Sequence, residues 1–217
     1  MNRHPSRRIY GLDLLRGLLR LFLRLLTRLD VRGLEHLPSH GPAILAINHV
    51  SWSDVPIIAA FSRGAMATFS AEKWEHAFPI NALLNYFGNA IYVQRGEIDR
   101  KALQAALAWL QAGGILGLAP EGTRSHDGVL HQARDGVTWL ATRSDALIVP
   151  FVIWGHENLA ADWKRLRRPR VCVRVGQPFH LPPEAAQARS RDLGIYTEQI
   201  MHHLAALLPP ERRGPYA

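Results

Sequence analysis

The chain has 217 residues, a formal net charge of +8 and a single cysteine, Cys172. This length is typical of one domain that buries enough apolar surface to need no cross-links, and one thiol excludes an intramolecular disulfide framework and any multi-cysteine metal site. The excess of positive charge indicates an anionic partner, either nucleic acid or an acidic membrane surface.

The first apolar segment, residues 10–29, is rich in leucine but carries arginine at every fourth position from Arg16 to Arg28. On a single helix this spacing gathers the arginines into one stripe. Such a helix is long enough to cross a bilayer, but each arginine near the bilayer centre would cost about 2.5–3.5 kcal/mol. Residues 1–30 are therefore predicted to form a basic amphipathic segment, one helix or a hairpin, that lies in the membrane interface. The alternative is an ordinary helix packed on its own domain.

Short apolar runs alternate with helical patterns over the rest of the chain, which is typical of an α/β fold with a mixed, largely parallel sheet flanked by helices. The predicted strands are residues 42–48, 90–94, 115–119, 147–154 and 171–175. The predicted helices are residues 54–60, 80–87, 99–111, 135–143 and 184–208. We assign residues 31–208 to this domain and expect residues 209–217 to form a flexible tail. In strand 171–175, valines alternate with polar residues, which predicts an exposed face that includes Cys172.

Polar residues that could carry chemistry follow three of these strands. His49, Arg95 and Glu121 each lie just past the end of a predicted strand. Ligands of such sheets gather beyond the carboxyl ends of the strands. The three side chains are therefore expected to converge on one site at one edge of the sheet.

His49 and Asp54 form a candidate proton-transfer pair. An imidazole can remove a proton from an alcohol near neutral pH, and a carboxylate can orient the ring. On an ideal helix a separation of five residues would place the two side chains about 140° apart. The pairing therefore requires a turn, with His49 in a loop and Asp54 at a helix start. The alternative is a loop histidine beside an ordinary helix N-cap.

The segment Glu121-Gly122-Thr123-Arg124 is a candidate anion-binding loop. A glycine there lets the backbone approach a ligand, and backbone N–H groups can hold an oxyanion. Arg124 could bind a phosphate through charge-assisted hydrogen bonds, with Arg95 and Lys73 as further phosphate contacts. A solvated surface turn with exposed cations is the alternative for all three.

Other catalytic signatures are absent from the sequence. No Gly-x-Ser-x-Gly elbow supports a serine hydrolase, and no Walker loop or Gly-x-Gly-x-x-Gly motif follows a strand. Nucleic-acid binding rests on net charge alone, without a recognition motif, and is not expected.

Four blocks of this sequence resemble the glycerolipid and lysophospholipid acyltransferase superfamily, most closely its bacterial 1-acyl-glycerol-3-phosphate acyltransferases. Residues 49–54 (HVSWSD) resemble its HxxxxD motif, and residues 92–96 (YVQRG) resemble its second block. Residues 120–125 (PEGTRS) match the third block and residues 148–151 (IVPF) resemble the fourth, in the family's order. Residues 133–136 (ARDG) depart from the pattern, because the family often has paired lysines before this glycine.

The resemblance implies a peripheral enzyme on the cytoplasmic face of the cell membrane. It implies that His49 activates the free hydroxyl of a lysophospholipid, lysophosphatidic acid being favoured, and that Asp54 orients His49. The acyl donor is then acyl-CoA or acyl-acyl-carrier protein as co-substrate, with no cofactor and no metal. Lys73, Arg95, Glu121, Gly122, Thr123 and Arg124 are the expected substrate-binding residues. Another lysolipid or glycolipid acceptor, and a non-catalytic membrane-binding relative, remain as alternatives.

Overall fold

A mixed sheet forms the centre of the molecule in the computed structural model, which describes residues 11–78, 81–82, 84–85, 89–93 and 100–217. Its seven strands within these ranges have the order β1-β7-β6-β2-β5-β3-β4. The strands are β1 (Arg28–Arg32), β2 (Ala43–Ile47), β3 (Met66–Ala71), β4 (Ile91–Val93), β5 (Ile115–Leu118), β6 (Leu147–Trp154) and β7 (Arg170–Val175). Every pairing is parallel except that of β6 with β7, so the predicted mixed, largely parallel sheet is confirmed.

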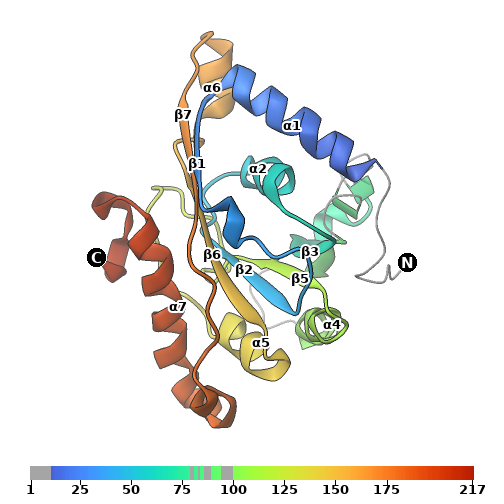
Figure 1. Cartoon of the computed structure of the whole chain (residues 1–217), viewed down its shortest axis with the longest axis vertical. Coiled ribbons are helices and arrows are strands. Elements are labelled where there is room, and N and C mark those ends of the chain that lie inside the picture. Colours follow the sequence, from blue (N-terminus) through green and yellow to red (C-terminus); the bar gives the residue numbers. More distant parts are fainter. Residues whose placement is uncertain (1–10, 79–80, 83, 86–88, 94–99) are drawn as a thin grey trace.

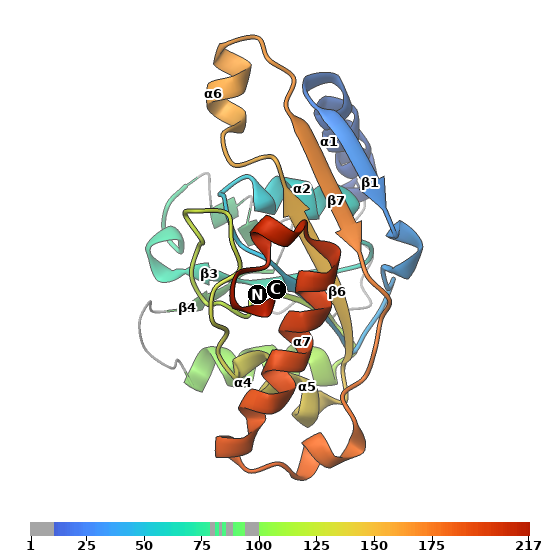
Figure 2. The same cartoon turned by 90° about the vertical axis from the view of Figure 1, so that its left-hand side faces the viewer.

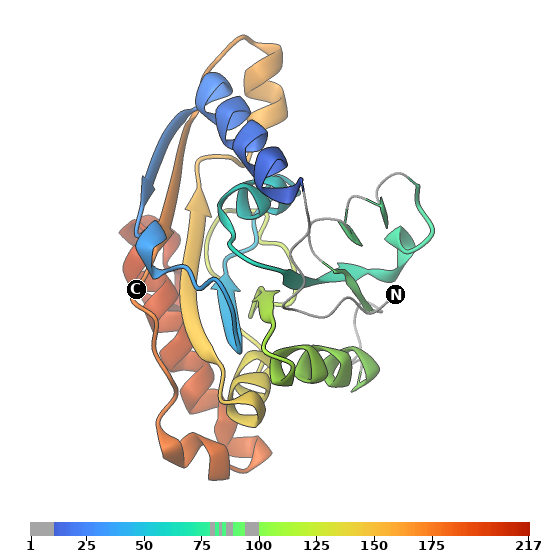
Figure 3. The same cartoon turned by 45° about the vertical axis from the view of Figure 1, so that its right-hand side comes forward.

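Helices cover both faces of the sheet (Figures 1 and 3). One face carries α1 (Leu12–Leu26), α2 (Asp54–Phe61) and α6 (Leu159–Lys164), and the other carries α4 (Arg100–Gln111), α5 (Gly136–Ser144) and α7 (Leu193–Leu207). Strand β2 is buried along its whole length because its side chains alternate between two cores. Ile44 and Ala46 pack towards α4, α5 and α7, whereas Leu45 and Ile47 pack towards α1 and α2.

Several predicted elements have different bounds in the structure. Strand β3 and helix α6 were not predicted, and the helix expected over residues 184–208 is one α-helix, α7, preceded by two short 3-10 turns, Pro183–Gln187 and Ser190–Asp192. Of the helix expected over residues 80–87, residues 81–82 and 84–85 are described and are helical, and the others lie outside the described residues. Strand β3 lacks a strong sequence pattern and is held by its parallel pairing with β5, which buries Met66 and Ala67.

The N-terminal helix differs from the predicted basic stripe. Helix α1 ends at Leu26, and Arg28–Arg32 forms strand β1 beside β7. Arg16 is only 6% exposed, because its guanidinium donates to the carbonyl oxygen of Gly64 at 2.6 Å and pairs with Asp13 at 3.2 Å. The expectation that all four arginines share one outward stripe is therefore wrong.

The face that α1 turns outward is apolar. Leu14, Leu18, Leu21, Phe22 and Leu25 are each about half exposed or more. Their spacing of three and four residues places them on one side of the helix. Figure 1 shows α1 on the outside of α2, next to α6. The outward face of α1 is therefore mainly apolar, although Arg24 is exposed as well.

The C-terminal segment, expected to be a flexible tail, is packed against the domain, so this prediction is wrong for residues 209–217. It forms two 3-10 turns, Pro210–Arg212 and Gly214–Tyr216, and Tyr216 is buried. The Tyr216 hydroxyl accepts a hydrogen bond from the amide of Ala133, and Arg212 binds the carboxylate of Glu157. Figure 2 shows these turns folded back beside the loops between β5 and α5.

Strand β7 also differs from its predicted pattern. Cys172 is buried rather than on an exposed face. Arg170 and Arg174, which flank it on the same side of the strand, both bind the carboxylate of Asp30 on the adjacent strand β1. Cys172 is therefore buried although the two arginines on its side of the strand bind a charged partner.

Candidate functional site

The candidate site lies at the carboxyl edge of the parallel strands. His49 follows β2 by two residues, Lys73 follows β3 by two, and Glu121 follows β5 by three. His49 and Glu121 thus lie past neighbouring strand ends at one edge, as expected for two of the three residues predicted to converge. Arg95, which follows β4 in the sequence, lies outside the described residues.

The structure contains the turn that is required to pair His49 with Asp54. Asp54 is the first residue of α2, and its Oδ2 accepts a hydrogen bond from His49 Nδ1 at 2.6 Å. With Nδ1 donating to the carboxylate, Nε2 of the neutral ring carries the free lone pair. The His49 side chain is 30% exposed, so this nitrogen can act as a base towards a substrate.

The loop that carries His49 is fixed to the neighbouring strand β6 and to the loop after β5. The Asn48 side chain exchanges two hydrogen bonds of 2.8 Å with the backbone of Ile153. The carbonyl oxygen of His49 accepts a hydrogen bond from the amide of Ser125 at 2.7 Å. Both the base and the candidate anion-binding loop are therefore set in one rigid frame.

The Asp54 carboxylate is almost completely buried but fully surrounded by donors. Oδ2 also accepts the amides of Val50 and Ser51 at 3.1 Å, and Oδ1 accepts a hydrogen bond from Nε2 of His156. Burial raises the pKa of Asp54, but the hydrogen bonds from His156 and His49 outweigh that effect and hold the pKa below its usual range. Asp54 is thus an ionised carboxylate at neutral pH.

His156 is a residue of this cluster that the sequence motifs do not predict. It follows β6 by two residues, the same offset at which His49 follows β2. The rule applied to the ends of the other predicted strands would therefore have selected it. Instead, the segment 147–154 was interpreted only as an apolar block.

Glu121, the first residue of the candidate anion-binding loop, has a buried side chain. Burial raises the pKa of Glu121 to about 7, and the charge of nearby His131 and the backbone amides of His131 and His49 offset only part of this effect. Its Oε2 has no hydrogen-bond partner among the described residues. Glu121 is therefore placed to support the loop from below rather than to contact a substrate from the surface.

The backbone of the loop leaves two amides available for a ligand. Gly122 has a positive φ of 71°, and its N–H donates to the carbonyl oxygen of Ala119 at 3.1 Å. An oxyanion contact through the Gly122 N–H is therefore excluded in this conformation. The amides of Thr123 and Arg124 make no hydrogen bond to any residue that the structure describes. These two donors take the place of the glycine as candidate oxyanion contacts.

The cations of the site differ in their surroundings. Arg124 is exposed and forms no ion pair within the described ranges, and the side chain of Arg134 lies directly beside Gly122. Lys73 is exposed, with its Nζ 4.8 Å from the ring centre of Trp74, and lies two strands away from His49, about 10 Å across the sheet. Arg124 and Arg134 are thus the cations of the loop nearest His49.

Asp135, which departs from the family pattern, has a structural role. Its carboxylate accepts a hydrogen bond from the hydroxyl of Thr197 at 2.7 Å, which ties the start of α5 to α7.

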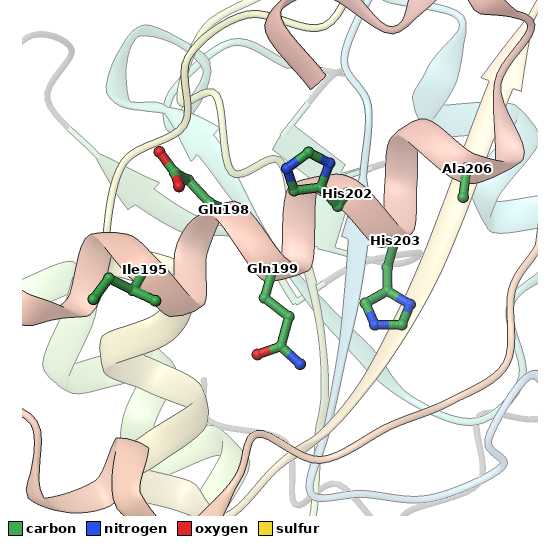
Figure 4. Close-up of a pocket in the computed structure, with 6 residues that line it drawn as sticks. All are labelled: Ile195, Glu198, Gln199, His202, His203 and Ala206. Carbon is green, nitrogen blue, oxygen red and sulfur yellow. The ribbon is translucent and has the colours of Figure 1, made fainter. Parts of the chain in front are cut away.

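A separate hollow on the outer side of α7 is lined by Ile195, Glu198, Gln199, His202, His203 and Ala206 (Figure 4). All six come from α7, and none belongs to the cluster around Asp54.

The family model described as Acyltransferase matches residues 28–154, more than half of the chain. The chloroplastic 1-acyl-sn-glycerol-3-phosphate acyltransferase LPAT1 of Arabidopsis thaliana is 26% identical over 70% of this chain and 44% of its own length. The 1-acyl-sn-glycerol-3-phosphate acyltransferase alpha of Bos taurus is 24% identical over 82% of this chain and 61% of its own length. A lyso-ornithine lipid O-acyltransferase of Pseudomonas aeruginosa is 31% identical over 39% of this chain and 32% of its own length.

A solved structure has the same fold. The crystal structure of the 1-acyl-sn-glycerophosphate (LPA) acyltransferase PlsC from Thermotoga maritima aligns with a TM-score of 0.71 and 22% identity, covering 96% of this chain and 82% of that chain. The chain spans less than two thirds of the length of these curated relatives, between 32% and 61%.

The raised pKa of Glu121 predicts a specific pH dependence of stability. Between about pH 4.5 and 7 the folded protein keeps a proton on Glu121 that the unfolded chain has lost, so this residue lowers the free energy of unfolding as pH rises through that window. Glu121→Gln, which cannot ionise, should gain stability relative to the wild type on going from pH 5 to pH 8, by at most about 3 kcal/mol. Urea unfolding at a series of pH values measures this difference.

The matched control is Glu211→Gln, which alters an exposed carboxylate in the C-terminal segment. Its stability should follow the wild type at every pH. If the curves of Glu121→Gln and the wild type also run parallel, Glu121 is not the buried, protonated group described above.

Proposed function

Because the chain belongs to the acyltransferase family, we propose that it transfers an acyl group from acyl-CoA or acyl-acyl-carrier protein to the free hydroxyl of a lysophospholipid. The observation that carries this proposal is the 2.6 Å hydrogen bond between His49 Nδ1 and Asp54 Oδ2, beside the loop of Glu121 and Arg124. The bond leaves Nε2 of a partly exposed imidazole free to act as a base. The amide of Ser125 holds the loop of the free Thr123 and Arg124 amides to the His49 carbonyl. Acyl transfer to an alcohol requires such a base and such oxyanion donors in one site.

In the first step, His49 Nε2 removes the proton from the acceptor hydroxyl as its oxygen bonds to the thioester carbonyl carbon. The carbonyl π electrons move to its oxygen, which becomes the oxyanion, and the amides of Thr123 and Arg124 donate to it. Asp54 stabilises the imidazolium that forms, because its carboxylate is ionised and already bound to Nδ1.

In the second step, the tetrahedral intermediate collapses and the C–S bond breaks. The thiolate leaves and takes the proton from His49 Nε2, which returns the ring to its starting state. The activated hydroxyl attacks the thioester directly, so this mechanism uses no covalent acyl-enzyme and needs no protein nucleophile.

The acceptor is proposed to be 1-acyl-glycerol-3-phosphate, giving phosphatidic acid. Two cations, Arg124 and Arg134, belong to the loop beside His49, and a phosphate is the ligand that arginine binds through two parallel hydrogen bonds. The printed names of the plant and bovine relatives agree with this acceptor. The name of the Pseudomonas relative supports the alternative of another lysolipid acceptor.

Replacing the proposed base tests the chemistry. His49→Ala should lower the rate of acyl transfer by about 10³-fold, because general base catalysis is lost while the binding residues remain. The measurement follows free-thiol release from acyl-CoA with a panel of lysolipid acceptors. His40→Ala, at an exposed histidine before β2, is the matched control and should retain the wild-type rate.

Transfer that survives in His49→Ala would rule out this mechanism. A wild-type protein that releases no thiol with any acceptor or donor, yet binds vesicles, would favour a non-catalytic membrane-binding relative.

Replacing the proposed phosphate contact tests the acceptor. Arg124→Ala should raise the KM for 1-acyl-glycerol-3-phosphate by about tenfold or more, because one of the two proposed phosphate-binding guanidinium groups is lost, and should leave kcat nearly unchanged. The KM for lyso-ornithine lipid, which carries no phosphate, should not rise in parallel. Arg143→Ala, at the far end of α5, is the control. Equal KM increases for both acceptors would reject the phosphate role.

We also propose that the protein docks peripherally on the cytoplasmic face of the cell membrane through the outward face of α1. This face presents Leu14, Leu18, Leu21, Phe22 and Leu25, and contiguous exposed apolar surface is typical of membrane contact. Within the described ranges, no helix has the length and apolar character needed to span a bilayer. Because α1 packs on α2, whose first residue is Asp54, docking would hold the site next to its lipid substrates.

The turn after α6 extends this surface. Leu166 is 95% exposed, and Lys164, Arg165 and Arg167 surround it. The turn lies beside α1, because the ring of Phe22 contacts the ring of Trp163 and the Trp163 indole donates to the carbonyl oxygen of Leu26. An exposed leucine among cations suits insertion between anionic headgroups.

Polar substitutions on this face should weaken docking. The double variant Leu18→Ser and Leu21→Ser should lower binding to vesicles that contain anionic phosphatidylglycerol by about tenfold, because less apolar surface leaves water. Vesicle sedimentation measures the effect. The control is Ile195→Ser, an even more exposed apolar residue on α7, which covers the other face of the sheet. Unchanged binding by the double variant would reject α1 as the docking helix.

A further inference from the structure

The Asp54 carboxylate lies between two imidazole rings. His49 donates to Oδ2 from Nδ1, and His156 donates to Oδ1 from Nε2. The side chain of His49 is 30% exposed, whereas that of His156 has no exposed surface. Only His49 can meet a substrate, so any influence of His156 on the reaction passes through Asp54.

The hydrogen bond to Asp54 defines the role of His156. Because Asp54 is ionised and can only accept, Nε2 of His156 must carry the proton of this hydrogen bond. Its Nδ1 is buried and has no partner among the described residues. His156 is therefore a buried donor to Asp54 that no substrate can reach.

The two carboxylate oxygens depend on different partners. Oδ2 accepts three donors, which are the His49 ring and the amides of Val50 and Ser51. Oδ1 accepts one, His156. If this donor were lost, a buried ionised oxygen would have no hydrogen bond from the described part of the chain. The carboxylate would then rotate or bind a proton, and either change alters its contact with His49.

The backbone around His156 is tightly held. The Ser53 hydroxyl, at the start of α2, donates to the carbonyl oxygen of His156 at 3.2 Å. The adjacent Glu157 accepts hydrogen bonds from the Gly155 amide and from Arg212 of the C-terminal segment. His156 lies two residues beyond the part of the chain that the family model matches. The second histidine thus belongs to a part of the site that the shared motifs do not describe.

We propose that His156 is a positioning residue that holds the Asp54 carboxylate in the orientation in which it binds and stabilises His49. The proposal rests on the proposed function, because the reaction it serves is proton transfer at His49. It assigns the loop after β6 a part in the site alongside the loops after β2 and β5. It also assigns the C-terminal segment a role as the brace of that loop, through Arg212 and Glu157.

Two substitutions distinguish the effect of the His156 hydrogen-bond donor from the effect of the volume of its ring. His156→Phe fills the space without a donor and should lower kcat on the order of 10- to 100-fold, the usual effect of losing a group that orients another through a hydrogen bond. The KM values for donor and acceptor should stay within about twofold, because His156 touches neither. His156→Gln can place an amide N–H near the position of Nε2 and should recover most of the lost rate. Thermal unfolding of each variant shows whether it is folded at the assay temperature.

Nuclear magnetic resonance of the ¹⁵N-histidine-labelled protein tests the geometry without any assay of activity. In the wild type, His49 should be the Nδ1–H tautomer and His156 the Nε2–H tautomer, each with a hydrogen-bonded ring proton. His156→Phe should shift the His49 ring proton, and His156→Gln should leave it near its wild-type position. His40→Gln is the control and should change neither signal.

An Nδ1–H tautomer at His156, or a His49 ring proton that does not move in His156→Phe, would overturn the proposal even if the variants failed to fold well enough for kinetics. So would a kcat of His156→Phe within twofold of the wild type. If the wild-type protein has both predicted tautomers but transfers no acyl group, the proposed function is wrong and the proposed geometry of the two histidines still holds.

Discussion

The buried carboxylate of Asp54 is the constraint around which the site is organised. An ionised carboxylate inside a protein is costly unless donors surround it, and the described part of the chain gives Asp54 four hydrogen-bond donors from two loops. The loop after β2 supplies the His49 ring and two amides, and the loop after β6 supplies His156. Because all four donors must lie around one carboxylate, the order of the strands that carry these loops determines the position of His49.

The sheet meets this requirement because β2 lies between β6 and β5. All three strands run in the same direction, so their carboxyl ends meet at one edge. Asn48 fastens the His49 loop to β6, and the Ser125 amide fastens it to the loop after β5. The C-terminal segment adds a brace to the third loop through Arg212 and Glu157. The residues proposed for proton transfer and for anion binding thus lie at adjacent strand ends.

The apolar and polar patterns of the sequence predicted the central strands and the pairing of His49 with Asp54. Apolar runs predicted β2, β5 and β6 to within a residue or two, and the need for a turn between His49 and Asp54 was confirmed. Errors arose where a side chain binds a distant group. Arg16 turns inward to the Gly64 carbonyl, and Tyr216 packs on the loop at Ala133. The sequence pattern of either segment cannot reveal these partners, because they lie 48 and 83 residues away.

The sequence alone determined the class of sheet, the pairing of His49 with Asp54 and the loop of Glu121 to Arg124, because each depends on residues close together or on the repeating geometry of strands. The tertiary structure decided which face of α1 points outward, which loop amides are free and that a second histidine completes the Asp54 site. The outward face of α1 and the position of His156 depend on contacts between segments far apart in the chain, and the free amides depend on the tight turn at Gly122. His156 lies 102 residues from Asp54, and only the parallel pairing of β2 with β6 brings them together.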